Sequence, residues 1–136
     1  MVKVIMGGTG SGKTKELIDR VNAAVTEEKG SVVCIARGSK LTFDISHDAR
    51  LIDAEDYAIK DYDTLLGFLC GIHAGNYDIT SIFIDGLYKV AGNKELAQAE
   101  KFLGSLEQFA EKYGVKITVA ISEDVANATD NIKKFF

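Results

Sequence analysis

A glycine-rich run near the amino terminus has the residue types and the spacing of a phosphate-binding loop. It matches the pattern G-x-x-x-x-G-K-[ST], in which glycines let the backbone wrap around an anion and point its N–H groups inward. The lysine of this pattern reaches the β- and γ-phosphates of a nucleotide, and the hydroxyl of its last residue coordinates Mg²⁺. The predicted phosphate-binding residues are Gly7, Gly8, Thr9, Gly10, Ser11, Gly12, Lys13 and Thr14.

The segments on either side of this run support that interpretation. Residues 2–6 are apolar apart from Lys3 and rich in β-branched side chains, which predicts a buried parallel strand. After the loop, apolar residues recur at helical spacing to about residue 28, and Gly30 is a suitable terminator. The helix would point the positive end of its dipole at bound phosphate. The expected ligand is a nucleoside triphosphate with Mg²⁺, and the alternative is a glycine-rich turn that contains a lysine by chance.

An acidic residue farther along the chain completes the predicted metal site. Residues 79–84 are typical of another buried strand, and Asp85 and Gly86 follow it directly. An aspartate at the carboxyl end of such a strand, as in a Walker B strand, holds Mg²⁺, usually through water. A turn formed by Asp-Gly is the alternative. We predict Lys13 and Asp85 as catalytic residues, and Thr14 and Asp85 as the metal ligands.

The residue that would orient a water or an acceptor hydroxyl is not given by a motif. Many P-loop ATPases carry a glutamate directly after the Walker B aspartate, and Gly86 at that position argues against a fast ATPase of this design. Glu123 lies just after the last predicted strand and is the third predicted catalytic residue. Its neighbour Ser122 would sense the γ-phosphate if that strand lies between those carrying the P-loop and Asp85. Helix capping or a solvated acidic turn is the alternative for both.

Other side chains are candidates for contacts with the nucleotide. Loop cations able to reach phosphate are Arg37, Lys40 and Arg50. His47 stands next to Asp48, which could orient its ring, and a capped or solvent-facing histidine is the favoured alternative. We expect His73 to satisfy a backbone carbonyl at the end of a buried helix. The aromatic residues that could stack on a base are Tyr57, Tyr62, Tyr77 and Tyr88.

The remaining pattern alternates strands with helices. Further strands are predicted at 31–36 and 115–121, with a short one at 50–53. A helix capped by Asp61 or Asp63 should run to about residue 74, and another capped by Asn93 to about residue 113. The polar tail should form a short helix or strand. This order predicts a single α/β domain over residues 1–136, a three-layer P-loop fold with a mainly parallel sheet of about four or five strands. A RecA-like strand order is preferred.

Composition restricts the class of protein. The 136 residues carry a net charge of −4 and show no basic run, which argues against nucleic acid as a partner. No stretch has the length of a signal-peptide core or a membrane span, so we expect a cytoplasmic protein that does not enter membranes. Cys34 and Cys70 lie in apolar segments without the spacing of a metal site and are expected to be buried.

The first half of the chain resembles the thymidine kinases of the smaller, zinc-bearing type. The matching segments are Gly12-Lys13-Thr14, Glu16-Leu17-Ile18 with Arg20, Ser46-His47-Asp48 and the strand that ends in Asp85. The resemblance covers about half of the chain, and its specific motif is the P-loop. It implies the nucleotide-binding core and its sheet topology. That family places a catalytic glutamate where this chain has Gly86, and it carries a zinc-binding segment and a nucleoside-binding lasso that we do not expect here.

These observations favour ATP over GTP, because Asn93-Lys94-Glu95-Leu96 lacks the aspartate of the Asn-Lys-x-Asp motif. We expect a magnesium-dependent ATP-binding protein. Its enzymatic activity stays open: a slow ATPase is one candidate, whereas the missing glutamate after Asp85 favours a non-catalytic role. One alternative is a small-molecule, nucleoside-like kinase with an unidentified acceptor. The other is a non-catalytic module whose bound nucleotide regulates a protein partner or a homo-oligomer.

Overall fold

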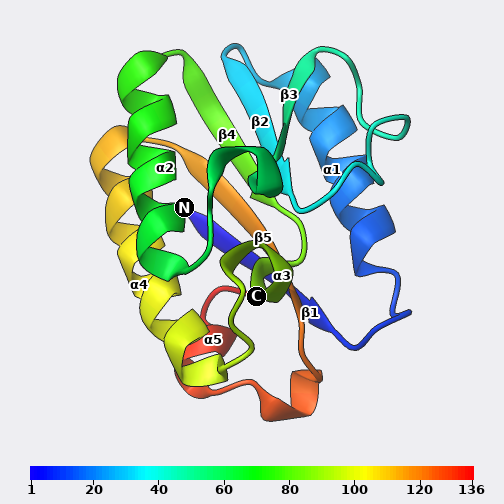
Figure 1. Cartoon of the computed structure of the whole chain (residues 1–136), viewed down its shortest axis with the longest axis vertical. Helices are drawn as coiled ribbons and strands as arrows, with labels where there is room; N and C mark the ends of the chain where they lie inside the picture. The colour runs from blue at the N-terminus through cyan, green and yellow to red at the C-terminus, as the bar shows by residue number, and fades with distance from the viewer.

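Five parallel strands form one sheet in the computed structural model, which describes all residues 1–136 (Figure 1). The strands are β1 (Val2–Gly7), β2 (Ser31–Ala36), β3 (Ala49–Asp53), β4 (Ile79–Ile84) and β5 (Lys116–Ser122). Their order is β1-β5-β4-β2-β3, so β1 and β3 are the edge strands and β5 lies between β1 and β4. Because every pairing is parallel, all five strands end at the same edge of the sheet.

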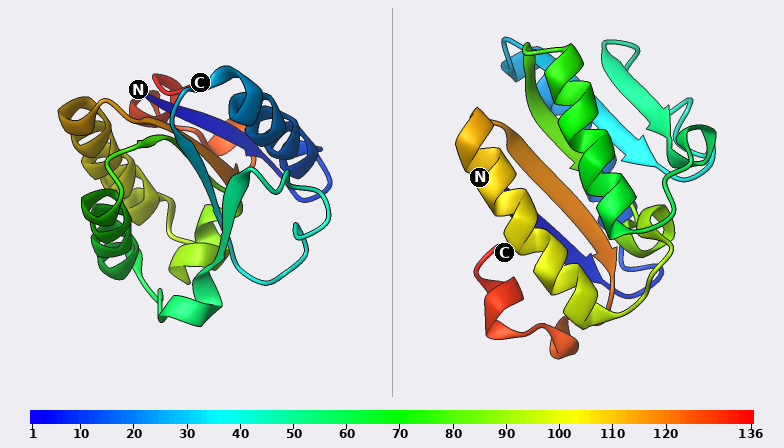
Figure 2. Two further views of the ribbon diagram at one scale, coloured as in Figure 1. Left: turned by 90° about the horizontal axis from the view of Figure 1, so that it is seen from above. Right: turned by 60° about the vertical axis from the view of Figure 1, so that its left-hand side comes forward.

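Helices cover both faces of the sheet and produce three layers (Figure 2). Helix α1 (Lys13–Glu27) lies on one face, and α2 (Tyr62–Gly75) and α4 (Leu96–Tyr113) lie on the other. The short helices are α3 (Leu87–Ala91) and α5 (Asp130–Lys133), and the 3₁₀ turns are η1 (Ala54–Tyr57) and η2 (Val125–Asn127). The prediction of an α/β fold with a mainly parallel sheet is confirmed. None of the helices combines the length and the apolar character needed to cross a membrane.

Two apolar clusters join these layers. On the α1 side, Leu17 and Val21 lie one helical turn apart and pack in a cluster with residues of β2, β3, β4 and β5. On the other side, α2 and α4 enclose a larger cluster of 28 buried residues, among them Leu69 and Leu103. Burial on both faces explains why the strands are near-continuous apolar runs without strict alternation. The packed sheet therefore brings the carboxyl ends of its strands, where the predicted site residues lie, to one edge.

The helix caps follow the prediction at α2 and differ from it at α4. The side chain of Asp61 accepts from the Thr64 N–H at 2.7 Å, and the Thr64 hydroxyl accepts from the Asp61 N–H, which completes a capping box. The prediction that Asn93 caps α4 is wrong, because the helix begins at Leu96. Asn93 instead closes a turn in which its side-chain oxygen accepts from the Glu95 N–H at 2.8 Å.

Two further predictions need correction. Cys34 is buried, but Cys70 is exposed on the outer side of α2, because this helix covers the sheet with the stripe that contains Leu65 and Leu69. His73 donates to no carbonyl. Its ring packs between aromatic side chains of α4, with 4.4 Å between the ring centroids of His73 and Tyr113.

Gly30 provides a test of the packing before β2. A Cβ atom at this position would overlap the carbonyl oxygen of Asp78 and the methyl group of Thr80. Gly30→Ala should therefore lower the free energy of unfolding by about 1–3 kcal/mol, as overpacking does. Gly71→Ala is the matched control: the space around Gly71 in α2 is open, so this change should raise stability by about 1 kcal/mol. Urea denaturation measures both, and a Gly30→Ala variant as stable as the wild type would contradict the packing described.

Candidate functional site

The glycine-rich loop connects β1 to α1 at the carboxyl edge of the sheet. Gly10 and Gly12 have φ angles of 82° and 87°, a left-handed conformation that other residues adopt only at a cost. The turn is closed by the Ser11 N–H, which donates to the Gly8 carbonyl at 3.2 Å. No side chain caps the first turn of α1, so N–H groups at the start of this helix are free to bind an anion.

Lys13 folds its side chain back over this loop. Its ammonium group donates to the Gly8 carbonyl oxygen at 3.1 Å and is exposed to solvent. A neutral carbonyl is a weaker partner for an ammonium group than a phosphate oxygen is. The side chain is thus held across the loop by a bond that an anion can replace.

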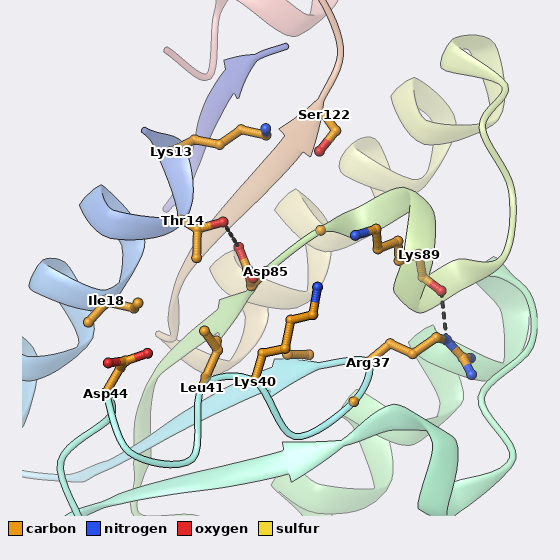
Figure 3. A pocket seen from close by; sticks show the side chains of 13 residues that line it. Lys13, Thr14, Ile18, Arg37, Lys40, Leu41, Asp44, Asp85, Lys89 and Ser122 are labelled. Atoms are coloured by element: carbon orange, nitrogen blue, oxygen red, sulfur yellow. Dashed lines mark hydrogen bonds between the residues drawn. The ribbon is translucent and has the colours of Figure 1, made fainter. Parts of the chain in front are cut away.

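Thr14 and Asp85 lie side by side although 71 positions separate them in the chain. The Thr14 hydroxyl donates to Asp85 Oδ1 at 3.4 Å (Figure 3). Asp85 extends β4, and its N–H donates to the Ile35 carbonyl of β2 at 2.9 Å. Partial burial raises the pKa of Asp85, and the Thr14 hydroxyl, Lys13 and Lys89 oppose this shift.

The Thr14–Asp85 pair has the donor chemistry that Mg²⁺ requires. Mg²⁺ prefers oxygen ligands, and in nucleotide sites it uses one or two protein groups together with water and phosphate. A hydroxyl and a carboxylate at 3.4 Å fit that arrangement. The chain contains no group of three or more His, Cys, Asp and Glu residues arranged to hold a metal by themselves.

A cavity of about 330 Å³ opens beside Asp85, on the side of β2 and its loop (Figure 3). Lys40 and Lys89 enter it from different elements, the loop after β2 and helix α3, and both side chains point toward the space beside Asp85. Its lining residues are Lys13, Thr14, Ile18, Ala36, Arg37, Gly38, Lys40, Leu41, Asp44, Asp85, Gly86, Lys89 and Ser122.

A second cavity, of about 480 Å³, adjoins the loop on the side of β5. Thr9 and Gly10 of the loop line it, as do Lys94 and Glu123. Residues that line both cavities are Lys13, Thr14, Gly86, Lys89 and Ser122. Ser122 is the register partner of Gly7 at the end of β5, so the strand that carries it does lie between β1 and β4.

Both carboxylate oxygens of Glu123 are engaged. Oε1 accepts from the Tyr88 hydroxyl at 2.8 Å, and Oε2 accepts from the Asn127 side chain at 3.0 Å. These hydrogen bonds, from Asn127 first and then from Tyr88, lower the pKa of Glu123. A carboxylate held in its ionised form by two donors is a poor proton acceptor, so the geometry gives little support to Glu123 as a general base.

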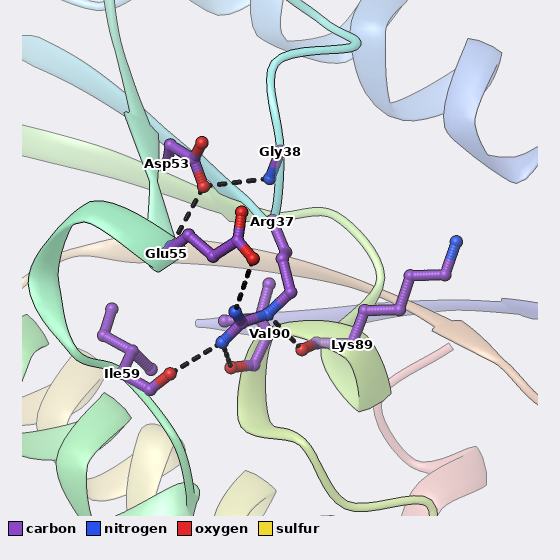
Figure 4. Close-up of polar contacts among 7 residues, drawn as sticks. All are labelled: Arg37, Gly38, Asp53, Glu55, Ile59, Lys89 and Val90. Carbon is purple, nitrogen blue, oxygen red and sulfur yellow. Dashed lines mark hydrogen bonds and ion pairs between the residues drawn. The ribbon is translucent and has the colours of Figure 1, made fainter.

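Arg37 serves the fold and not an anion. Its Nε donates to the Lys89 carbonyl at 2.8 Å and its Nη2 to the Ile59 carbonyl at 2.7 Å (Figure 4). The carboxylate of Glu55 lies 3.8 Å from Nη1. Arg37 therefore ties the end of β2 to α3 and to the segment before α2, which engages its Nε and Nη2 groups.

The remaining residues proposed from the sequence as nucleotide contacts do not all lie at the glycine-rich loop. Lys40 reaches the 330 Å³ cavity, whereas Arg50 lines a separate groove beside α2 together with Tyr57. His47 is exposed on the loop between β2 and β3 and lines neither cavity at the glycine-rich loop. Of the tyrosines, Tyr88 lines the 480 Å³ cavity.

Sequence reasoning missed helix α3 and with it Lys89. The run 87–91 is too short for a helical period to be recognised. Its signal was the pair Gly86 and Gly92, which bracket the run and have φ angles of 68° and 66°. Two glycines at this spacing after a strand are compatible with one short helix between them.

Comparisons with known proteins give no family for this chain. No protein-family model matches it, and no curated protein is similar enough in sequence to count as a relative. The function must therefore be inferred from the chemistry of the residues at the carboxyl edge of the sheet.

The raised pKa of Asp85 predicts how stability changes with pH. An aspartate with a native pKa above its ordinary value of 3.8 binds its proton more tightly in the folded state, so it reduces stability as the pH rises through its native pKa. Asp85→Asn removes this effect. The ligand-free variant should have a higher Tm than the wild type at pH 7, and the difference should shrink toward pH 3. A difference in Tm that is constant with pH would show that burial of the charge is not the cause.

The Tyr88 hydroxyl should influence the titration of Glu123. Tyr88→Phe removes one of the two donors, so the pKa of Glu123 should rise toward its ordinary value of 4.5. Because the native pKa is lowered, these bonds stabilise the fold above pH 4.5, and that contribution is lost as the pH falls through the native pKa. Carboxyl ¹³C NMR titration measures the shift. Tyr113→Phe is the control, since Tyr113 lies at the far end of α4, and equal titrations in all three proteins would refute the assignment.

Proposed function

We propose that this protein binds ATP together with Mg²⁺ at residues 7–14. The observation that carries the proposal is the 3.4 Å contact between Thr14 Oγ1 and Asp85 Oδ1. It brings a hydroxyl next to the loop lysine together with a carboxylate at the end of β4, the oxygen donors suited to a metal shared with a nucleotide. The position of β5 between β1 and β4 supports a P-loop fold of the RecA-like division.

Each residue has a separate task in this proposal. Phosphate oxygens accept from the loop N–H groups and from the free N–H groups at the start of α1. Lys13 exchanges the Gly8 carbonyl for the β- and γ-phosphates. Thr14 would bind Mg²⁺ directly, and Asp85 would bind it through water. The metal supplies positive charge that offsets the charge on the γ-phosphate oxygens.

Slow hydrolysis follows from the same residues. Gly86 has no side chain that could orient a water, and Glu123 is held by Tyr88 and Asn127. These features equally suit a nucleotide-dependent regulatory module. The small-molecule kinase is favoured by a different observation: the 330 Å³ cavity extends from the proposed ATP site at Lys13, Thr14 and Asp85 toward Lys40, which provides space for a second substrate beside the triphosphate.

Lys13→Ala tests the binding site directly. Loss of a charge-assisted hydrogen bond costs about 1.5–3 kcal/mol, so the affinity for ATP with Mg²⁺ should fall about ten- to hundredfold. Isothermal titration calorimetry with the non-hydrolysable analogue AMP-PNP measures this, with and without Mg²⁺. Lys29→Ala is the matched control, because Lys29 is exposed at the opposite end of the sheet. Equal affinity in the Lys13→Ala variant and the wild type would refute the proposal.

A further inference from the structure

Two lysines in the 330 Å³ cavity have no partner in the protein. Lys40 and Lys89 are both exposed, and neither side chain forms an ion pair with any carboxylate of the chain. Both line the same cavity and point toward the space beside Asp85 (Figure 3). Lysines that merely solubilise a surface have no reason to converge from two elements on one cavity.

The backbone that carries these lysines is cross-linked. Arg37 binds the carbonyls of Lys89 and Ile59 and so fixes α3 against β2 and the segment before α2 (Figure 4). The Gly38 N–H donates to Asp53 Oδ1 at 2.9 Å, which fixes the start of the loop that carries Lys40. The two lysines therefore extend from backbone segments that these hydrogen bonds hold in place.

The charge on this ligand follows from the charges in the cavity. In the proposed ATP site, Lys13 and Mg²⁺ already face the triphosphate. Lys40 and Lys89 add two positive charges beside it, and Asp44 adds one negative charge beside Ile18, so the space between the two lysines suits an anion, up to a dianion. A phosphomonoester is such a dianion near neutral pH, because its second pKa is about 6. Lysine binds phosphate as a point charge, whereas a carboxylate is matched better by the planar fork of arginine.

The carboxylates near Asp85 are poorly placed to act as a base for an acceptor bound by Lys40 and Lys89, which favours an acceptor that is already ionised. A hydroxyl acceptor must lose a proton as it attacks, but Glu123 does not line this cavity and its oxygens are occupied. Asp85 is paired with Thr14, and Asp44 lies beside Ile18, away from Lys89 (Figure 3). A phosphate oxygen is already ionised and requires no base.

We infer that this cavity binds a phosphomonoester that accepts the γ-phosphoryl group of ATP, an inference that rests on the proposed ATP site. An oxygen of the acceptor phosphate attacks the γ-phosphorus and forms a new P–O bond. The bond between the γ-phosphorus and the β,γ-bridging oxygen breaks, and ADP leaves with the electron pair. The acceptor becomes a diphosphate. Lys40 and Lys89 bind its phosphate and reduce the repulsion between the two anions.

The first experiment measures binding of a second anion. The full chain is saturated with AMP-PNP and Mg²⁺, so that its loop is occupied, and is titrated with glycerol 3-phosphate or with glycerol in a calorimeter. Glycerol 3-phosphate should bind and glycerol should not. Affinity for glycerol 3-phosphate should fall about tenfold in each of Lys40→Met and Lys89→Met, the loss expected for one charge-assisted bond. Lys29→Met is the control and should bind like the wild type.

The outcomes separate this inference from the proposed function. If AMP-PNP fails to bind, the ATP site is refuted and the inference with it. If AMP-PNP binds but glycerol 3-phosphate does not, or binds Lys40→Met and Lys89→Met as well as the wild type, only the inference is refuted. It is also refuted if these variants lose as much affinity for AMP-PNP as for glycerol 3-phosphate, because the lysines would then bind ATP itself.

The second experiment measures transfer. ADP release from ATP with Mg²⁺ is followed with ribose 5-phosphate, glucose 6-phosphate and nucleoside monophosphates, each beside its dephosphorylated counterpart. A phosphorylated compound should stimulate release about tenfold more than its counterpart and yield a diphosphate in ³¹P NMR. Equal stimulation by the dephosphorylated compounds, or stimulation by none, would overturn the role of acceptor.

Discussion

The hydrogen bond from Thr14 to Asp85 depends on the whole architecture of the sheet. It joins the first turn of α1 to the end of β4, and it forms because β5 lies between β1 and β4 and because all three strands are parallel. A reversed strand would carry its end to the opposite edge of the sheet. The apolar clusters on the two faces hold this order, and they thereby determine the spacing between the glycine-rich loop and the carboxylate.

Around this contact the charged residues divide into two groups. Residues of one group form hydrogen bonds within the fold. Arg37 donates to backbone carbonyls, and Glu123 accepts from Tyr88 and Asn127. Residues of the other group have ammonium groups that form no ion pair within the protein. The Lys13 ammonium group donates a hydrogen bond only to a loop carbonyl. The side chains of Lys40 and Lys89 form neither hydrogen bonds nor ion pairs within the protein. The hydrogen bonds of the first group stabilise the backbone segments that carry residues of the second group.

At the carboxyl edge of the sheet, the position of Asp85 reduces stability but suits the proposed metal binding. Burial disfavours its charge, and a nearby hydroxyl and two lysines compensate only in part. At the proposed site a metal ion would supply the missing compensation, so a carboxylate whose charge is disfavoured by burial suits the proposed binding of Mg²⁺. The glycines of the loop also reduce stability, because they lose more conformational entropy on folding than other residues do. Their lack of side chains leaves room for an anion close to the backbone.

Features that depend on residues close in the chain could be predicted from the sequence. Apolar runs and glycine positions predicted strand, loop and helix around residues 7–14, because strand burial and left-handed turns are decided by residues close in the chain. The binding of ATP and Mg²⁺ stays a prediction from that motif. Contacts between groups far apart in the chain became visible in the fold. Asp85 contacts Thr14, Arg37 binds backbone carbonyls, Glu123 accepts a hydrogen bond from Tyr88, and Lys89 and Lys40 line one cavity. The physical reason is that a side-chain partner far along the chain is set by strand order and register, which no local pattern encodes.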